Sequence, residues 1–169
     1  MIRLLICEDS AEARSLLRTL LADHPEIEIV GEAADGQDAL ARTIELSPDV
    51  VLMDVMMPVL DGVSATRRIR ELRPDVRIVA FTGSDDNELV RELEPDLVVL
   101  DVMMPGRSGL DVLAEMRSDP ALAEIPVIVI TAWDHVQPDV LAAGADRFFL
   151  KPFEAEDLKA AVAELLEAS

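Results

Sequence analysis

The sequence predicts a doubly wound α/β protein with a mostly parallel sheet and about seven strand-helix units. Seven short apolar runs lack the polar alternation of half-exposed strands, which is typical of strands covered on both faces. The segments between them carry apolar residues at helical spacing. Because the two patterns alternate strictly along the chain, they favour right-handed crossovers between parallel strands.

The candidate strands are rich in leucine and β-branched residues, which favour buried strands. They are IRLLIC (2–7), IEIV (27–30), VVLMD (50–54), RIVAFT (77–82), LVVLD (97–101), VIVIT (127–131) and RFFL (147–150).

The candidate helices fill the segments between these runs. In residues 11–22 the apolar positions follow the spacing i, i+3, i+4, i+7, i+8, at Ala13, Leu16, Leu17, Leu20 and Leu21. The same spacing recurs near the C-terminus at Leu158, Ala161, Val162 and Leu165. Weaker helical patterns cover residues 37–46, 64–72, 87–93, 110–117 and 137–143.

The pentapeptide DVMMP occurs twice, at residues 54–58 and 101–105. The longer frames PDVVLMDVMMPVLDG (48–62) and PDLVVLDVMMPGRSG (95–109) share their first proline and their last glycine. A strand, a helix and a strand have therefore been duplicated, or two related proteins have been joined.

Composition excludes several classes of function. The chain has 169 residues and a formal net charge of −19, and so acidic a surface repels nucleic acid and anionic membranes. No apolar run approaches the roughly 18 residues of a spanning helix. Cys7 is the only cysteine, so no disulfide can form within the chain, and because it lies in an apolar run we expect it to be a small buried hydrophobe. We expect a soluble, cytoplasmic protein that binds neither nucleic acid nor membrane.

Acidic residues gather where the predicted strands end. Glu8 and Asp9 follow the first strand, Asp54 ends the third and Asp101 ends the fifth. In a doubly wound sheet the ligand site lies beyond the carboxyl ends of the strands. Carboxylates that meet there repel one another unless a cation lies among them, and oxygen ligands suit Mg²⁺.

Other strand ends add groups that suit a phosphoryl group. Thr82 and Thr131 end two strands with hydroxyls, and Lys151 follows the last strand with a positive charge. Mg²⁺, a lysine and a threonine together suit the binding of the three oxygens of a phosphoryl group. A carboxylate would then be the nucleophile that accepts this group.

As a set, these residues resemble the receiver domain of bacterial two-component response regulators. Glu8 and Asp9 match the acidic pair, and Asp54 or Asp101 matches the phosphoryl-accepting aspartate. The remaining matches are the switch hydroxyl at Thr82 or Thr131, the switch aromatic at Phe148, and the lysine with its proline at Lys151 and Pro152.

The resemblance implies a flavodoxin-like fold, phosphorylation by a sensor histidine kinase or a phosphotransfer protein, and Mg²⁺ as the cofactor. The implied metal ligands are Asp9, the acceptor aspartate and a backbone carbonyl at Met56 or Met103. Glu8 belongs to the same metal site. A cis bond before Pro152 is also implied. Beyond Mg²⁺-dependent self-phosphorylation and dephosphorylation, no enzymatic activity is expected.

The chain does not match one complete receiver. Residues 1–86 resemble the first four strands of a receiver and lack its lysine, whereas residues 87–169 resemble the part from the acceptor strand to the last helix and lack its acidic pair. The repeat therefore indicates that two partial receivers have been fused. Together they form either one continuous α/β fold or a fold in which chains exchange segments. A natural fusion and an engineered chimera would leave the same residues.

Three arrangements are compatible with this fusion. In the first, one sheet has the order 2-1-3-4-5-6-7, and Asp54 joins Glu8 and Asp9. In the second, residues 49–95 form an extra lobe, and Asp101 joins the acidic pair, Thr131 and Lys151. In the third, two chains exchange C-terminal pieces, so that the lysine strand of one completes the Asp54 site of the other.

The uneven helix coverage of a seven-stranded receiver would leave apolar sheet surface bare, so we expect a homodimer, which strand exchange could form. A closed barrel of strand-helix units is a further possibility.

Two hypotheses of function follow. The first is a signalling module that accepts a phosphoryl group on Asp54 or Asp101. The second is a receiver-derived scaffold that folds and oligomerises without phosphotransfer. An enzyme on a barrel-like scaffold is a third reading, for which the sequence offers no substrate pocket.

Overall fold

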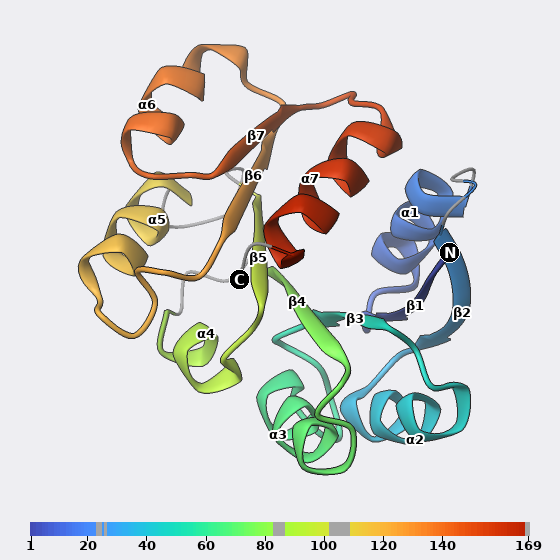
Figure 1. Cartoon of the computed structure of the whole chain (residues 1–169). Coiled ribbons are helices and arrows are strands. Elements are labelled where there is room, and N and C mark those ends of the chain that lie inside the picture. Colours follow the sequence, from blue (N-terminus) through green and yellow to red (C-terminus); the bar gives the residue numbers. More distant parts are fainter. Residues whose placement is uncertain (23–24, 26, 83–86, 102–108, 168–169) are drawn as a thin grey trace. The chain divides into compact units, whose positions relative to one another are not determined.

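The computed structural model describes residues 1–22, 25, 27–82, 87–101 and 109–167 (Figure 1). The strands are β1 (Ile2–Cys7), β2 (Ile27–Ala33), β3 (Val50–Asp54), β4 (Arg77–Thr82), β5 (Leu97–Asp101), β6 (Val127–Thr131) and β7 (Arg147–Leu150). The helices are α1 (Ala11–Ala22), α2 (Gly36–Leu46), α3 (Gly62–Leu72), α4 (Asn87–Leu93), α5 (Gly109–Ser118), α6 (Gln137–Ala142) and α7 (Ala155–Glu167), with a 3₁₀ turn at Asp134–Val136.

The seven predicted strands are all present, and six of them have the predicted bounds. The exception is β2, which continues three residues beyond the predicted end to Ala33. Its pairing with β1 shifts register between Leu4 and Leu5, and this irregularity lets Gly31 and Glu32 stay in the ladder. The tertiary pairing therefore overrides the weak strand preference of glycine and glutamate.

The predicted fold class is confirmed. The strands follow the order β2-β1-β3-β4-β5-β6-β7, and the described pairings of β1 with β2 and β3 and of β6 with β5 and β7 are parallel. The pairing of β1 with β3 excludes the lobed arrangement, which would have placed the acidic pair beside Asp101. The chain divides into two compact units, Met1–Ala80 and Phe81–Ser169.

The first unit packs helices on both sides of its strands. Figure 1 shows α1 on one side of β1 and β3, and α2 with α3 on the other. The central strands are covered on both faces, since neighbouring residues that point to opposite faces are both buried, Leu5 and Ile6 in β1 and Val51 and Leu52 in β3. Buried Cys7 lies in β1, as expected, and its burial raises the pKa of the thiol far above its usual range.

Aspartates fix the starts of two helices in the first unit. Asp35 accepts hydrogen bonds from the backbone N–H groups of Gln37 and Asp38 at the start of α2. Asp61 accepts one from Ser64 at the start of α3, and this bond holds the pKa of Asp61 below its usual value. Both caps satisfy N–H groups that a helix leaves unpaired at its first turn.

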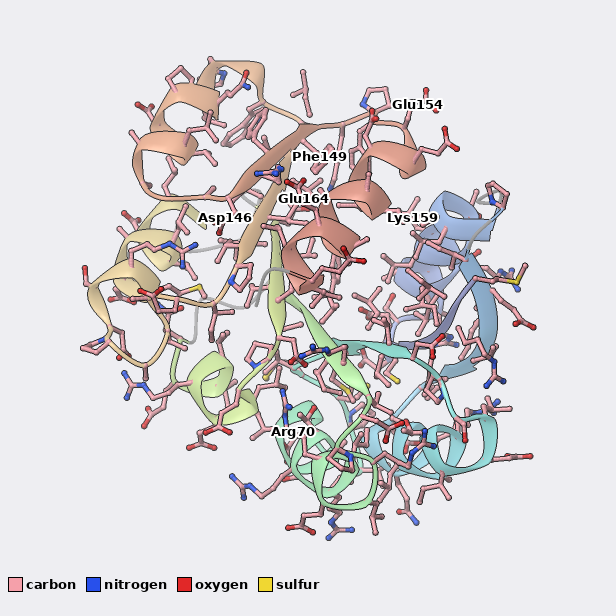
Figure 2. All side chains as sticks on the ribbon, viewed as in Figure 1. Arg70, Asp146, Phe149, Glu154, Lys159 and Glu164 are labelled. Atoms are coloured by element: carbon pink, nitrogen blue, oxygen red, sulfur yellow. The ribbon has the colours of Figure 1, made fainter. Side chains whose placement is uncertain are left out.

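The second unit has the same layered plan. Figure 1 shows α7 on one side of β5, β6 and β7, and α4, α5 and α6 on the other. Glu164, labelled on α7 in Figure 2, accepts a hydrogen bond of 2.6 Å from Arg147 of β7. Arg117 of α5 donates to Asp146 and to the carbonyl oxygens of Ala123, Ile125 and Gly144. This one side chain therefore anchors the loop before β6 and the loop before β7.

No helix in the described part of the chain is long and apolar enough to cross a membrane.

The loop between β3 and α3 contains a strained residue. Val59 has a φ of 66° and is 79% exposed. The left-handed region is costly for a β-branched side chain, and here little packing compensates. The repeated frame carries glycine at the corresponding position, Gly106.

We expect Val59→Gly to stabilise the protein. Glycine removes the cost of the left-handed conformation, about 1–2 kcal/mol. This exceeds the free-energy cost of glycine's greater freedom in the unfolded state, so the free energy of unfolding should rise by roughly 0.5–1 kcal/mol. Urea unfolding followed by circular dichroism measures this gain. Val59→Ala, which keeps a side chain, should gain less, and a Gly variant less stable than the parent would show that Val59 is not strained.

Candidate functional site

Three carboxylates meet at the carboxyl ends of β1 and β3. The two strands pair in parallel with Cys7 opposite Met53, so the residues that follow, Glu8 and Asp54, leave the sheet at the same level. One carboxylate oxygen from each of Glu8, Asp9 and Asp54 lies within 4.8 Å of the others. We call these three residues the carboxylate cluster.

Burial and mutual repulsion disfavour the charged forms of this cluster. Glu8 is only 7% exposed, and burial, followed by the nearby charge of Asp54, raises its pKa to about 7. Burial also raises the pKa of Asp54 to about 6, with a smaller contribution from the charge of Asp9. The cluster therefore holds a local excess of negative charge that a cation would stabilise.

Backbone groups orient two of the carboxylates. The N–H of Ser10 donates to Oε1 of Glu8 at 3.1 Å, and the N–H of Met56 donates to Oδ1 of Asp54 at 3.1 Å. Each bond fixes the orientation of one carboxylate oxygen.

Gly62 lets the start of α3 pass close to Asp54. A Cβ atom at position 62 would lie 2.2 Å from the carbonyl oxygen of Asp54, far inside contact distance. The Gly62 N–H donates to the carbonyl of Val55 at 3.1 Å, which ties α3 to the segment that follows Asp54. This glycine is the last residue of the repeated frame.

The second unit places different partners around its copy of the motif. Nζ of Lys151 lies 2.7 Å from Oδ2 of Asp101, and the two side chains are 43% and 24% exposed. Thr131 is fully buried, its Oγ1 accepts from the Trp133 N–H at 3.2 Å, and its carbonyl accepts from the Lys151 N–H at 2.7 Å. The bond between Lys151 and Pro152 is cis, as the resemblance implied.

The remaining predicted site residues fall in three groups. The side chain of Met56 is 61% exposed, directly beyond Asp54. Phe148 pairs with Val129 in the sheet and is partly exposed. Thr82 ends β4, but its side chain lies outside the described part of the structure, as does the whole of Met103.

Sequence reasoning missed Arg14. Its Nη1 donates to the carbonyl oxygen of Glu8 at 2.5 Å and to that of Asp9 at 3.4 Å. No pattern in the sequence marks this contact, because its partners are backbone carbonyls.

The donor set of the carboxylate cluster fits a hard divalent cation such as Mg²⁺. Its oxygens converge within the reach of one ion, and burial with mutual repulsion raises the pKa of Glu8 and of Asp54, so a bound cation would favour their charged forms. The Asp101–Lys151 pair does not fit a cation as well, because the ammonium group already neutralises the carboxylate.

The fold and the carboxylate cluster define the chain as a receiver of the response regulator type. The response regulator receiver domain family model matches residues 4–93 and again residues 87–163, and the chain belongs to this family.

Curated relatives match about half of the chain. This chain is 49% identical over 90 residues to protein-glutamate methylesterase/protein-glutamine glutaminase 4 of Geobacter metallireducens. The aligned region covers 53% of this chain and 26% of that protein. This chain is also 40% identical over 90 residues to the transcriptional regulatory protein LiaR of Bacillus subtilis. That aligned region covers 53% of this chain and 43% of LiaR. The chain thus spans less than half the length of these relatives.

Solved receiver domains share the fold. The response regulator domain of Thermotoga maritima CheB superposes with a TM-score of 0.52 at 23% identity, covering 99% of this chain and 97% of that one. The isolated REC domain of RcsB from Salmonella enterica serovar Typhimurium, in the presence of phosphomimetic BeF₃⁻, superposes with a TM-score of 0.54 at 17% identity. This superposition covers 73% of this chain and 97% of that one. At these identities the likeness supports the fold alone.

We expect Gly62→Ala to destabilise the protein by roughly 2–3 kcal/mol, because its Cβ would displace the backbone at Asp54. Urea unfolding measures the change. Arg68→Ala, at an exposed position of the same helix, should change the free energy of unfolding by less than about 0.5 kcal/mol. Equal effects of the two substitutions would contradict the close approach.

We expect the metal-free protein to lose stability as the pH rises from 5 to 8. Asp54 and Glu8 have raised native pKa values, about 6 and about 7, so in this range the native state binds more protons than the unfolded state. The free energy of unfolding should fall by an amount on the order of 1 kcal/mol after solvent screening. Urea titrations in EDTA measure it.

Asp54→Asn provides the control for this pH dependence, because it removes one titrating group and one repulsive charge. Its stability should fall less between pH 5 and 8 than that of the parent. Identical slopes for parent and variant would assign the pH dependence to other groups.

Proposed function

We propose that this chain is a phosphoacceptor module in which Asp54 accepts a phosphoryl group and Mg²⁺ is the cofactor. The observation that carries this proposal is the convergence of Glu8, Asp9 and Asp54 within 4.8 Å at the carboxyl edge of the first unit. In this proposal the three carboxylates hold the ion, together with the backbone carbonyl of Met56. The bound ion would offset negative charge on the transferring phosphoryl group.

The reacting groups follow from this assignment. A carboxylate oxygen of Asp54 forms the new O–P bond while the P–N bond of a phosphohistidine breaks and the imidazole nitrogen keeps the electron pair. The hydrogen bond from the Met56 N–H to Oδ1 holds the carboxylate in one orientation for the attack. The phosphodonor is a sensor histidine kinase or a phosphotransfer protein, the donors that phosphorylate receiver domains.

Charge distinguishes the two candidate acceptors. Asp54 lies among carboxylates that a cation would draw together, whereas Asp101 is paired with Lys151. We therefore favour Asp54 over Asp101 as the acceptor. In this assignment Thr82 is the candidate switch hydroxyl of the first unit, and Thr131 and Phe148 belong with the Asp101 copy.

A scaffold without phosphotransfer is the second candidate, and one observation favours it. Residues 1–80 contain no lysine, and Lys151 contacts Asp101 of its own unit. Without an ammonium group the Asp54 site would bind a cation but stabilise a phosphoryl group less well. Exchange of C-terminal pieces within a homodimer remains a prediction that would supply the lysine from a partner.

Acetyl phosphate separates the two candidates. We expect incubation with acetyl phosphate and Mg²⁺ to add one phosphoryl group, seen by intact mass spectrometry, and EDTA to prevent it. Asp54→Asn should abolish the adduct, and Asp101→Asn, the matched substitution in the other copy of the motif, should retain it.

The same experiment can reject the phosphoacceptor role. If the parent gains no phosphoryl mass while calorimetry shows Mg²⁺ binding that Asp54→Asn weakens, the scaffold function holds. If only Asp101→Asn removes the adduct, the acceptor assignment is reversed.

A further inference from the structure

Arg14 closes the turn that carries two members of the carboxylate cluster. The residue lies on α1, and its Nη1 donates to the carbonyl oxygens of both Glu8 and Asp9, at 2.5 and 3.4 Å. Its side chain is only 19% exposed. The guanidinium group therefore bridges the helix and the backbone of the turn from a largely buried position.

The other side of the same guanidinium is anchored on β2. Nε of Arg14 lies 3.3 Å from Oε2 of Glu32, a residue that is 30% exposed. Arg18, one helical turn further along α1, lies 3.6 Å from the other oxygen of Glu32. Among the described contacts, only Arg14 connects Glu32 with the turn.

These residues line a groove of about 630 Å³ along β2, which also includes Asp38 and Arg42. Arg42 pairs with Asp38 at 2.8 Å, so each arginine of the groove has a carboxylate partner. The groove thus contains the ion pairs of Arg14, Arg18 and Arg42 and does not point to a separate anion site.

Arg14 affects a cation in the cluster in two opposite ways. Its positive charge repels the cation and should weaken binding. Its hydrogen bonds, however, fix the turn before the ion arrives, so less conformational entropy is lost on binding. Substitutions that keep the charge but lose the geometry separate the two effects.

We propose that Arg14 is a positioning residue: it holds the Glu8–Asp9 turn in the conformation that directs both carboxylates towards Asp54, and Glu32 fixes Arg14 in turn. The proposal depends on the proposed function only in taking the cluster to bind a divalent cation.

Mg²⁺ affinity, measured by isothermal titration calorimetry, tests the positioning role. Arg14→Lys keeps the charge but cannot span two carbonyls and Glu32, so it should weaken Mg²⁺ binding about fivefold to tenfold. Arg18→Gln loses the ion pair with Glu32 without touching the turn and should stay within about twofold of the parent. If Arg14→Lys binds like the parent and Arg14→Gln binds more tightly, Arg14 acts through its charge and the proposal is overturned.

A second pair of variants keeps the test decisive if Arg14 variants do not fold. Glu32→Gln removes the anchor and retains Arg14, and it should weaken Mg²⁺ binding about twofold to fivefold. Glu28→Gln removes the same charge from the same strand, where Glu28 pairs with Arg3 at 3.9 Å, and it should leave the affinity unchanged. Equal effects of the two substitutions would refute the anchoring by Glu32.

Hydrogen exchange separates failure of this proposal from failure of the proposed function. The Ser10 N–H donates to Glu8 Oε1, so its exchange reports the conformation of the turn without any metal. Arg14→Lys should speed this exchange, and Arg18→Gln should not. If the parent binds no Mg²⁺, the metal assignment fails, while unchanged Ser10 exchange in Arg14→Lys would independently overturn the positioning role.

Discussion

The convergence of three carboxylates at one edge of the first unit, with Glu8 buried and Asp54 half-buried, is the constraint on which the rest of the site depends. Parallel pairing of β1 with β3 brings Glu8 and Asp54 to the same level, and burial, with repulsion from a neighbouring aspartate, raises the pKa of each. A fold that only needed stability would place these groups apart or replace them. The surrounding structure instead holds them together, through hydrogen bonds from Ser10 and Met56 and the close approach that Gly62 allows.

The two copies of DVMMP show that a motif does not define its own chemistry. Asp54 and Asp101 each end a buried strand with the same following residues. Asp54 faces two acids and Asp101 faces Lys151, because the strands that pair beside them differ. A carboxylate among carboxylates attracts a cation, whereas a carboxylate paired with an ammonium group is already neutralised.

The two family matches give this contrast a simple origin. The model of the response regulator receiver domain matches residues 4–93 and 87–163, which overlap only in the segment around α4. The first match contains the acidic pair and no lysine, and the second contains Lys151 and no acidic pair. Each unit thus has one half of the charged residues that the resemblance to a receiver implies.

The sequence by itself determined the strands, the alternation with helices and the identity of the charged residues at the strand ends. Short runs such as VVLMD and VIVIT, apolar and rich in valine and isoleucine, are typical of covered strands, so local patterns were sufficient. The continuation of β2 through Gly31 could not be predicted in this way, because it depends on pairing with β1 rather than on the preference of the residues themselves.

Only the tertiary structure decided which groups share a site. The sequence left Asp54 and Asp101 equivalent, since their neighbours in sequence are the same, and the strand pairing made them different. The role of Arg14 was also hidden, because its partners are backbone carbonyls, which every residue carries and no pattern marks. Local structure follows from neighbours along the chain, whereas the electrostatics of a site follow from neighbours in space.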